Sequence, residues 1–536
     1  MTTRRTVLAG GLGLGLASLG LGACTPGRGN GPDSGAGPVD TTVLPAYQAY
    51  EGVKADLAAE DGRCSAAFLK YPSERPTLWA QPPGDGKPIT AIVPTSFGAP
   101  PPLTQNLYWQ ELNRRVGSEL QISTVPAGAD YNAKFATTVA GDQLPDWFYV
   151  GTIASRPDFM TSKTVDLTEH LAGDKIKQYP GLANIPAASW RECVFNGRLH
   201  ALPVSRGLVS LPSVLTRNDL LTKQGITTLP TDWEGLVALS KQLTGGQTWA
   251  WSSAPLGYAQ QSLDVPTQIV VTDGKLSWTL HDERQEQALE ATRKMVADGY
   301  VVPDAGSAPT ATRKLWFGAG RSILHSDSFI AWFSLLNANA KVDGIEIRAL
   351  PIIGFNGGQG TQSVGSANAG ISAINTKAAD RIETLLKIAD FLAAPFGTDE
   401  YLFQKFGTQG RNYTLNADGD PTPTDKTDEI NVMSLYLCDA ARVIYSAGHP
   451  DTAQAAYDHQ RQVMTKSVTD PTVALYSETA DKKLATLNRT LNDVAAGIIA
   501  GNQPVSDWSG AVDTFLNGGG NDILTEYQKS YDEAPQ

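Results

Sequence analysis

Hydrophobic and polar positions alternate with two different periods in the first part of the chain. Apolar runs at residues 89–93, 121–125 and 147–150 are short and bounded by polar residues, which predicts β-strands. Between them, residues 108–116 and 131–141 repeat apolar side chains every three or four positions, as the buried face of a helix does. Strand, helix, strand, helix, strand with short connections is typical of a parallel sheet with crossover helices. This part of the chain is therefore predicted to form an α/β unit.

The same alternation returns further along the chain. It predicts strands at 208–215, 345–353 and 369–374, and helices at 233–243, 283–298 and 376–394. Beyond residue 430 the pattern is mostly helical, and no internal repeat is visible. The whole chain is therefore predicted to be an α/β protein large enough for more than one hydrophobic core.

The N-terminus has the pattern of an export signal. Arg4 and Arg5 precede an apolar stretch at 7–21, which is shorter than the ~20 residues of a membrane-spanning helix. Leu21-Gly-Ala-Cys24 resembles the bacterial lipobox, in which the cysteine is acylated and becomes the first residue of the mature protein. We therefore predict a lipoprotein signal at 1–24 and a lipid anchor at Cys24; the alternative is an ordinary signal peptide with a cysteine by chance. The arginine pair is compatible with twin-arginine or Sec export.

The segment behind Cys24 is predicted to be a spacer. Residues 25–40 are rich in Gly, Pro and small polar residues, which cannot bury enough surface to fold. Residues 41–87 contain several prolines and a Pro-Gly-Asp-Gly turn and are predicted to be an N-terminal arm on the surface. A globular protein tethered to the extracellular face of the cytoplasmic membrane follows from these features.

Charge and cysteine content exclude several classes of function. The 55 acidic residues outnumber the 43 basic ones and no basic cluster occurs, which argues against a nucleic-acid partner. Cys64, Cys193 and Cys438 remain after the signal and are far apart, without a Cys-x-x-Cys pair. One disulfide is possible, but small buried thiols are the expected role. The histidines are scattered and Asn416–Asp420 favours a turn over a calcium loop, so we predict no metal and no cofactor.

Several motifs in order resemble the extracellular solute-binding proteins of ABC sugar importers. They are Asp130–Lys134, Ala140–Asp146, Val165–Leu171, Asn196–Pro203, Arg217–Asp219, Pro230–Glu234, Phe317–Ser322 and Phe406–Tyr413. The last is similar to a motif of the oligosaccharide-binding branch named after aldouronate uptake, with Gln409 in place of the usual Glu. The resemblance covers about residues 88 to 430.

The resemblance implies a two-lobed periplasmic-binding-protein type II fold. Each lobe would be a mostly parallel sheet flanked by helices, and the hinge would consist of strands crossing near 202–207 and 363–370. Lobe one is expected at 88–204 plus 350–425, and lobe two at 205–349 plus 426–536. The implied function is that of a monomeric, non-enzymatic receptor that closes on a saccharide and delivers it to ABC permease subunits in the membrane.

Candidate ligand-binding residues come first from aromatic side chains. Sugars present flat C–H faces with hydroxyl edges, so their receptors combine aromatic rings with small polar groups. Trp249, Trp251 and Tyr258 lie in a segment of this composition. We expect one of the two tryptophans to line the cleft and the other to face the core. Trp109, Trp147 and Trp233 lie within helix or strand patterns and are predicted to be core residues.

The remaining candidates follow from the resemblance and from polar chemistry. Asp327 and Trp332 follow a predicted strand, where related maltose-type receptors carry a polar group and a stacking tryptophan. Asp327 would accept hydroxyl hydrogen bonds or, alternatively, cap the next helix. Arg411, with Tyr413, would bind a carboxylate or hydroxyls or, alternatively, form a surface salt bridge. Arg206 at the predicted hinge is a further candidate.

A secreted glycoside hydrolase is the main alternative function. Such an enzyme needs two carboxylates about 5–10 Å apart across a sugar. No carboxylate pair of this chain lies in a recognisable strand-end motif, and no Gly-x-Ser-x-Gly or His-Glu-x-x-His motif occurs. The sequence therefore favours a binding protein over an enzyme.

Overall fold

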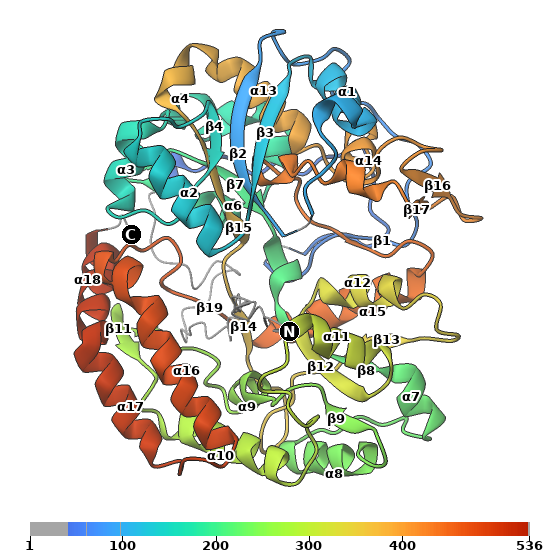
Figure 1. Ribbon diagram of the computed structural model, residues 1–536, viewed down its shortest axis with the longest axis vertical. Helices are drawn as coiled ribbons and strands as arrows, with labels where there is room; N and C mark the ends of the chain where they lie inside the picture. The colour runs from blue at the N-terminus through green and yellow to red at the C-terminus, as the bar shows by residue number, and fades with distance from the viewer. Residues whose placement is uncertain (1–40, 61, 97, 534–536) are drawn as a thin grey trace, which may run out of the picture.

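The computed structural model describes residues 41–60, 62–96 and 98–533. The predicted signal, Cys24 and the predicted spacer lie outside these residues. Figure 1 shows two lobes, one above the other, each built around its own sheet, with helices α16, α17 and α18 packed along one side of the lower lobe. The upper lobe contains a five-stranded sheet and the lower lobe a four-stranded sheet.

The sheet of the upper lobe has the strand order β3-β2-β4-β15-β7. Strand β2 runs parallel to β3 and β4, whereas β15 runs antiparallel to β4 and β7. The predicted strands at 89–93, 121–125 and 147–150 and the two helices between them are confirmed. The strands are β2 (Ile89–Thr95), β3 (Leu120–Pro126), β4 (Trp147–Tyr149), β7 (Leu202–Ser205) and β15 (Asn368–Ile374).

Helices cover this sheet and bury their apolar faces against it. Helix α1 begins after Asn106, whose side chain accepts a hydrogen bond from the backbone N–H of Trp109, and ends at Gly117 in a left-handed conformation. Leu112, Phe135 and Leu385 are fully buried against the sheet residues in one hydrophobic cluster. The helices are α1 (Leu107–Val116), α2 (Ala129–Ala140), α3 (Arg156–Lys163), α4 (Thr168–Leu171), α5 (Pro180–Ala183), α6 (Ala187–Arg191), α13 (Ile382–Leu392) and α14 (Asp399–Phe406).

The sheet of the lower lobe has the strand order β13-β8-β12-β9. Only the β9–β12 pair is parallel, whereas β8 is antiparallel to both β12 and β13. Both sheets are therefore mixed and not mostly parallel as predicted, because β8 and β15 each enter a sheet directly from the other lobe and run against their neighbours. The strands are β8 (Pro212–Arg217), β9 (Trp249–Trp251), β12 (Ser322–Ser328) and β13 (Ile347–Ala349).

The helices of the lower lobe come from the middle and the end of the chain. Asp232 caps α8 by accepting from the N–H of Gly235 at 2.7 Å. Asp282 caps α10 in the same way through the N–H of Arg284. These helices are α7 (Asn218–Lys223), α8 (Trp233–Leu243), α9 (Leu256–Ser262), α10 (Glu283–Ala297), α11 (Thr310–Gly318), α12 (Ala331–Ala338), α15 (Pro450–Val463), α16 (Ala485–Ile499), α17 (Asp507–Phe515) and α18 (Asn521–Glu533).

Short strand pairs complete the fold. The N-terminal arm joins the rest of the molecule through β1, which runs parallel to β18. The short strands are β1 (Ala67–Phe68), β5 (Val194–Phe195), β6 (Arg198–Leu199), β10 (Ile269–Thr272), β11 (Lys275–Trp278), β14 (Gln362–Val364), β16 (Tyr413–Leu415), β17 (Pro421–Pro423), β18 (Ile444–Tyr445) and β19 (Ser467–Thr469).

The two predicted crossing segments lie side by side between the lobes. Asn368 at the start of β15 pairs with Ser205 at the end of β7, and the N–H groups of Arg206 and Gly207 both donate to the carbonyl of Ala367 at 2.8 Å. The register shifts within β15 at Gly370, whose φ of 154° and close approach to the Tyr149 ring leave no room for a side chain. The chain thus passes from lobe to lobe through hydrogen-bonded neighbours.

The hydrophobic cores divide two segments differently from the predicted lobes. Residues 350–353 were expected in lobe one, but Leu350, Ile352 and Ile353 are buried in the cluster of the lower lobe, and the N–H of Leu350 donates to Val214 in β8. Residues 432–438 were expected in lobe two, but they are buried in the cluster of the upper lobe. Proximity to β8 and β15, not position along the chain, decides these contacts.

The cysteines and the predicted core tryptophans behave as expected. Cys64, Cys193 and Cys438 are buried and unpaired. Trp109, Trp147 and Trp233 are also buried. Over the described residues, no helix combines the length and apolar character that crossing a membrane requires.

Candidate functional site

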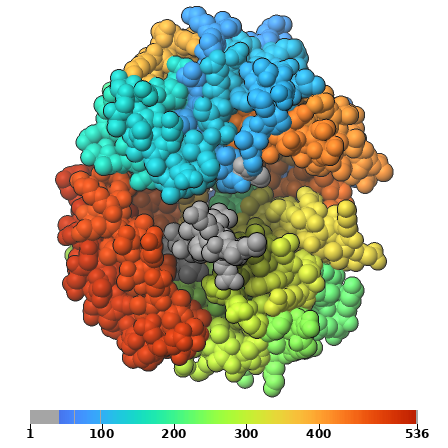
Figure 2. Space-filling model, in the orientation of Figure 1, coloured from blue at the N-terminus to red at the C-terminus, as the bar shows by residue number. Residues whose placement is uncertain are grey.

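The molecule is hollowed between its two lobes (Figure 2). A cavity of about 1070 Å³ lies against the lower sheet at the ends of β8 and β12 and is closed by α9, by the loop before α11 and by α16. The crossing segment contributes Ser363 and Gly365 to its wall, and the loop after β19 contributes Asp470. Residues from before, within and after the crossing segment therefore line one cavity, which we call the large cavity.

Trp249 is an aromatic side chain in the wall of the large cavity. It begins β9 and is half-buried, and the Arg321 guanidinium lies 5.1 Å from its ring centroid. The same guanidinium lies 4.9 Å from Trp316, so it is sandwiched between two rings. The ring of Trp249 is thus held in place by the cation while the residue borders the cavity.

Trp251 lies two positions further along the same strand but belongs to the core. Its exposed fraction is 0% and its indole N–H donates to the Ser240 hydroxyl at 3.0 Å. Residues two apart on a strand share a face, so their different fates come from depth along the strand: Trp249 begins it, and Trp251 ends inside the hydrophobic cluster. One tryptophan of the pair thus borders the large cavity, and the other lies in the core.

Tyr258 on α9 also lines the large cavity, although only 3% of it is exposed. Its hydroxyl donates to the carbonyl of Pro351 at 2.5 Å and accepts from the N–H of Ile353 at 3.3 Å. Burial raises the pKa of this phenol, so it stays neutral. Tyr258 is therefore a rigid wall residue whose polar end is already used.

Asp327 at the end of β12 faces the large cavity and is held by three groups. It accepts from the N–H of Ser328 at 2.7 Å, lies 3.0 Å from the Lys314 ammonium and 3.3 Å from Nε2 of His325. Burial alone would raise its pKa, but these hydrogen bonds and the ammonium lower the pKa well below its usual range. Helix α12 begins at Ala331 without a side-chain cap, so Asp327 is not the N-cap that the alternative proposed.

Trp332 is not part of the cavity wall. Its exposed fraction is 1%, and its indole N–H donates to the carbonyl of Ile347 at 2.8 Å. It packs in the core beside Phe329 and His459. Trp332 and Trp251 were candidate ligand-binding residues, but neither ring has an exposed face to offer a ligand.

Arg411 and Tyr413 do not line the large cavity. Arg411 forms a bidentate pair with Glu429, with distances of 2.8 Å from Nε and 2.5 Å from Nη2, as the salt-bridge alternative expected. Tyr413 is 3% exposed and packs in a small cluster with Phe68 and Phe396. The motif that suggested these residues therefore builds a loop of the upper lobe and not a part of the cavity wall.

Arg206 lies at the hinge but is committed to a buried carboxylate. Asp439 is completely buried and accepts from Arg206 at 3.1 Å, from Arg442 at 2.5 Å and from Lys405. Burial would raise the pKa of Asp439, but the three cations lower it. Arg206 does not line the large cavity or the second cavity described below.

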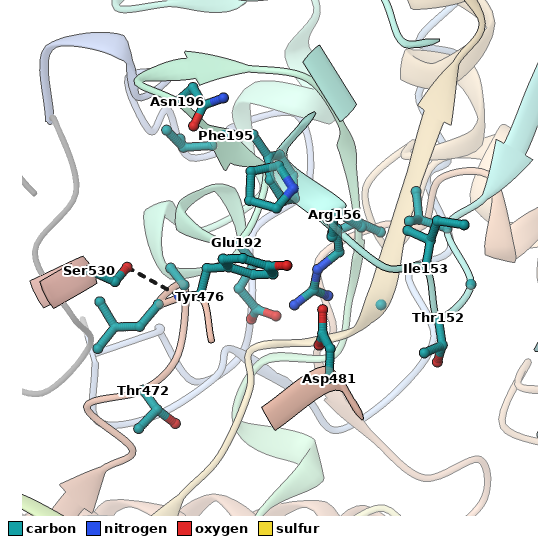
Figure 3. Close-up of a pocket in the computed structure, with 18 of the residues that line it drawn as sticks. Thr152, Ile153, Arg156, Glu192, Phe195, Asn196, Thr472, Tyr476, Asp481 and Ser530 are labelled. Carbon is teal, nitrogen blue, oxygen red and sulfur yellow. Dashed lines mark hydrogen bonds between the residues drawn. The ribbon is translucent and has the colours of Figure 1, made fainter. Parts of the chain in front are cut away.

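A second cavity of about 540 Å³, the small cavity, is lined by loops of the upper lobe and by a C-terminal segment (Figure 3). Sequence reasoning missed all of its residues, because its wall joins loops of the upper lobe to a C-terminal segment with no marked motif. Asp470 borders the large cavity and Thr472 the small one, and Thr472 donates to Asp470 through both its N–H and its hydroxyl. The polar lining comprises Asn132, Tyr149, Thr152, Arg156, Glu192, Asn196, Thr472, Tyr476, Asp481, Tyr527 and Ser530.

Charged groups converge in the small cavity. Figure 3 shows the Arg156 guanidinium pointing toward Asp481, with Glu192 beside it. Burial raises the pKa of both carboxyl groups, and the nearby Arg156 opposes that shift. Arg156 Nε, the Tyr476 hydroxyl and Asp481 Oδ2 are buried and have no hydrogen-bond partner within the described structure. The small cavity thus offers donors and acceptors that the protein leaves unused.

The sequence family of bacterial extracellular solute-binding proteins matches residues 108–427, more than half of the chain. This chain belongs to that family. Two proteins of Bacillus subtilis strain 168 are similar at 21% identity: lipoprotein LipO, over 78% of this chain and 88% of its own length, and the polygalacturonan/rhamnogalacturonan-binding protein YtcQ, over 79% and 88%. Among solved structures, the N-glycan transport solute binding protein NgtS of Streptococcus pneumoniae matches with a TM-score of 0.63 at 16% identity, covering 84% of this chain and 99% of NgtS.

Membership of the solute-binding family indicates a role for the cavities that their geometry alone does not. Proteins of this family are binding receptors and not catalysts, so the glycoside hydrolase alternative is not supported. In the solute-binding protein described here, no group of three or more His, Cys, Asp or Glu residues within the described ranges is arranged to hold a metal ion. The two cavities between the lobes are therefore the candidate solute site.

Proposed function

We propose that this solute-binding protein is the membrane-anchored receptor of an ABC importer and holds an oligosaccharide between its two lobes. The observation that carries the proposal is the pair of neighbouring cavities between the lobes: Asp470 lines the large one and Thr472 the small one, and residues 363–371 of the crossing segment contribute to both walls. A single sugar ring would fill only a part of this space, whereas a chain of linked rings would extend from one lobe to the other.

The lining of the large cavity suits carbohydrate. Trp249 supplies an aromatic ring, and Tyr258 supplies a second ring in the wall. Hydroxyl and amide groups surround these rings, among them Ser253, Gln261, Ser326 and Ser328. Apolar sugar faces stack on an accessible ring such as that of Trp249, while the small polar groups bind the sugar hydroxyls. Tyr258, which is only 3% exposed, gives the wall rigidity and not a stacking face.

The names of related proteins support the same substrate class. YtcQ is a polygalacturonan/rhamnogalacturonan-binding protein and NgtS belongs to N-glycan transport. Their identity to this chain is low, so they support a saccharide in general and not a particular one.

The anchor completes the proposed receptor. Acylated Cys24, followed by the flexible spacer at 25–40, would hold the lobes at the extracellular face of the membrane beside the permease, after export by a twin-arginine or Sec signal. Closure of the lobes on the saccharide would be the state that the permease recognises. In this proposal lobe one contains the sheet with β2 and lobe two the sheet with β8, each with the helices that pack on it.

Titration with a glycan panel tests the proposal. Tryptophan fluorescence and melting temperature would be followed for the soluble protein without residues 1–24. A ligand at a hundred times its Kd stabilises the folded state by about 2.7 kcal/mol, which gives a measurable rise in Tm. No change with any oligosaccharide would refute the sugar assignment, and release of shorter sugars would show hydrolysis.

A further inference from the structure

The charged side chains that line the two cavities are mostly acidic. The large cavity has Arg313 as its lining cation against three carboxylates, and the small cavity has Arg156 against two. The carboxylates are Asp304, Asp327 and Asp470 in the first and Glu192 and Asp481 in the second. Whatever binds along this hollow meets more negative than positive groups.

Each lining cation is already close to a carboxylate of the protein. The charge of Arg156 acts on the carboxyl groups of both Glu192 and Asp481, and Figure 3 shows its guanidinium pointing toward Asp481. Arg313 interacts with Asp327, and Asp327 is also 3.0 Å from the Lys314 ammonium just outside the lining. A ligand carboxylate would therefore compete with protein carboxylates for every cation of the lining.

The cation-rich cluster at the hinge does not change this balance. Arg206, Lys405 and Arg442 surround the buried Asp439, and none of the four lines either cavity. Each of the three cations donates to Asp439, and because none lines a cavity, a ligand there does not meet them directly.

The unused hydrogen-bonding groups in the small cavity fit hydroxyls better than charge. The Arg156 Nε–H is a donor, Asp481 Oδ2 is an acceptor and the Tyr476 hydroxyl is both. Neighbouring hydroxyls on a sugar ring donate and accept in the same way, and a carboxylate accepts two of them at once. Leaving such groups buried without partners is unfavourable, and a polyhydroxyl ligand would supply the missing hydrogen bonds.

We infer that the cleft selects uncharged saccharides and discriminates against uronic acids, with Asp327 and Asp481 as the residues that set this preference. The inference rests on the proposed function. A uronate buried here would lack a cation of its own and would lie beside carboxylates, so its desolvation is not compensated. A primary hydroxyl at the same position has no such cost.

Matched ligand pairs test the inference. Oligosaccharides of glucose, mannose and galactose are compared with the same compounds oxidised at their primary hydroxyls to uronic acids, by calorimetric titration at low ionic strength. The neutral member of the best-binding pair is expected to bind at least tenfold more tightly. Asp327→Asn and Asp481→Asn are each expected to reduce this ratio at least threefold, by removing a repelling charge. Asp343→Asn removes the same charge from an exposed position outside both cavities and is expected to leave the ratio unchanged.

The outcomes separate the two claims. Equal or tighter binding of the uronic forms would overturn the inference and leave the oligosaccharide receptor intact. An unchanged ratio in both cavity variants, each with a wild-type melting temperature, would also overturn it. Absence of binding by every neutral and oxidised compound would overturn the proposed function and this inference together.

Discussion

Two neighbouring regions of the lower lobe contain aromatic side chains that looked equivalent in the sequence. One is the wall of the large cavity, with Trp249, and the other is the core beside it, with Trp251 and Trp332. The wall ring is half-buried and faces a cation, whereas both core rings are inaccessible and use their indole N–H groups inside the protein. A shift of one or two positions along the chain therefore decides whether an aromatic residue beside the cavity contributes to ligand affinity or to the stability of the core.

The largest expected effect is on the core. Trp251→Ala removes a completely buried ring and leaves a cavity in the cluster, so it is expected to lower the free energy of unfolding by about 3–5 kcal/mol. Thermal and denaturant unfolding measure this loss, and Trp251→Phe, which refills most of the space, should lose less. A stable Trp251→Ala protein with weakened saccharide binding would reverse the roles of wall and core.

A second effect on the core depends on pH. His459 packs between Phe329 and Trp332, and burial lowers its pKa from 6.5 to about 4. Between these values the unfolded chain binds a proton that the folded protein does not, so stability falls as pH falls from about 7 to about 4, by roughly 3 kcal/mol. Unfolding followed across this range measures the slope.

His459→Phe is expected to remove this acid-dependent loss. His281→Gln, at a half-exposed position on the surface, serves as the control and should keep it. An unchanged slope in His459→Phe would show that the aromatic core does not hold His459 in its neutral form.

The effect expected for the wall is smaller and appears in binding. Trp249→Ala is expected to weaken the affinity for the saccharide by about 1 kcal/mol, or about fivefold, because a stacking surface is lost. Trp316→Ala is the matched control: it also removes a ring that faces Arg321, but Trp316 does not line the cavity. Equal affinities in the two variants would contradict the role given to the wall.

The smallest effect is expected outside both regions. Arg411→Ala breaks the pair with Glu429 at the surface of the upper lobe and is expected to leave saccharide affinity unchanged. Calorimetric titration checks this prediction. A tenfold loss of saccharide affinity would contradict this prediction and show that Arg411 contributes to binding.

Much of the fold was predictable because local patterns and tertiary packing agree. The strands at 89–95, 120–126 and 147–149 and the helices between them follow the periods of their apolar residues. The sheet of the lower lobe was harder to predict, since β8, β12 and β9 are adjacent in space but far apart in the chain. The apolar pattern of a strand also does not show whether the strand runs parallel or antiparallel to its neighbours. Residues 350–353 were assigned to the wrong core for the same reason.

The candidate site was predictable only in part. Trp249, Tyr258 and Asp327 border the large cavity, where composition and resemblance had suggested ligand contacts. Arg156, Glu192 and Asp481 were missed, because each is an ordinary charged residue until the fold brings them together. Arg411 and Arg206 were predicted to bind the ligand, but each already pairs with a carboxylate of the protein, which the sequence does not show.

Reading the chain alone was enough to establish the residue periods, the acidic balance and the order of motifs that resembles solute-binding proteins, and to predict an export signal ending at Cys24. These are local or additive properties, and each can be read from neighbouring residues. Only the tertiary structure decided which tryptophan lines the cavity, which carboxylates converge on Arg156 and which core residues 350–353 and 432–438 join. Those are properties of depth and proximity, and they arise when segments hundreds of residues apart pack together.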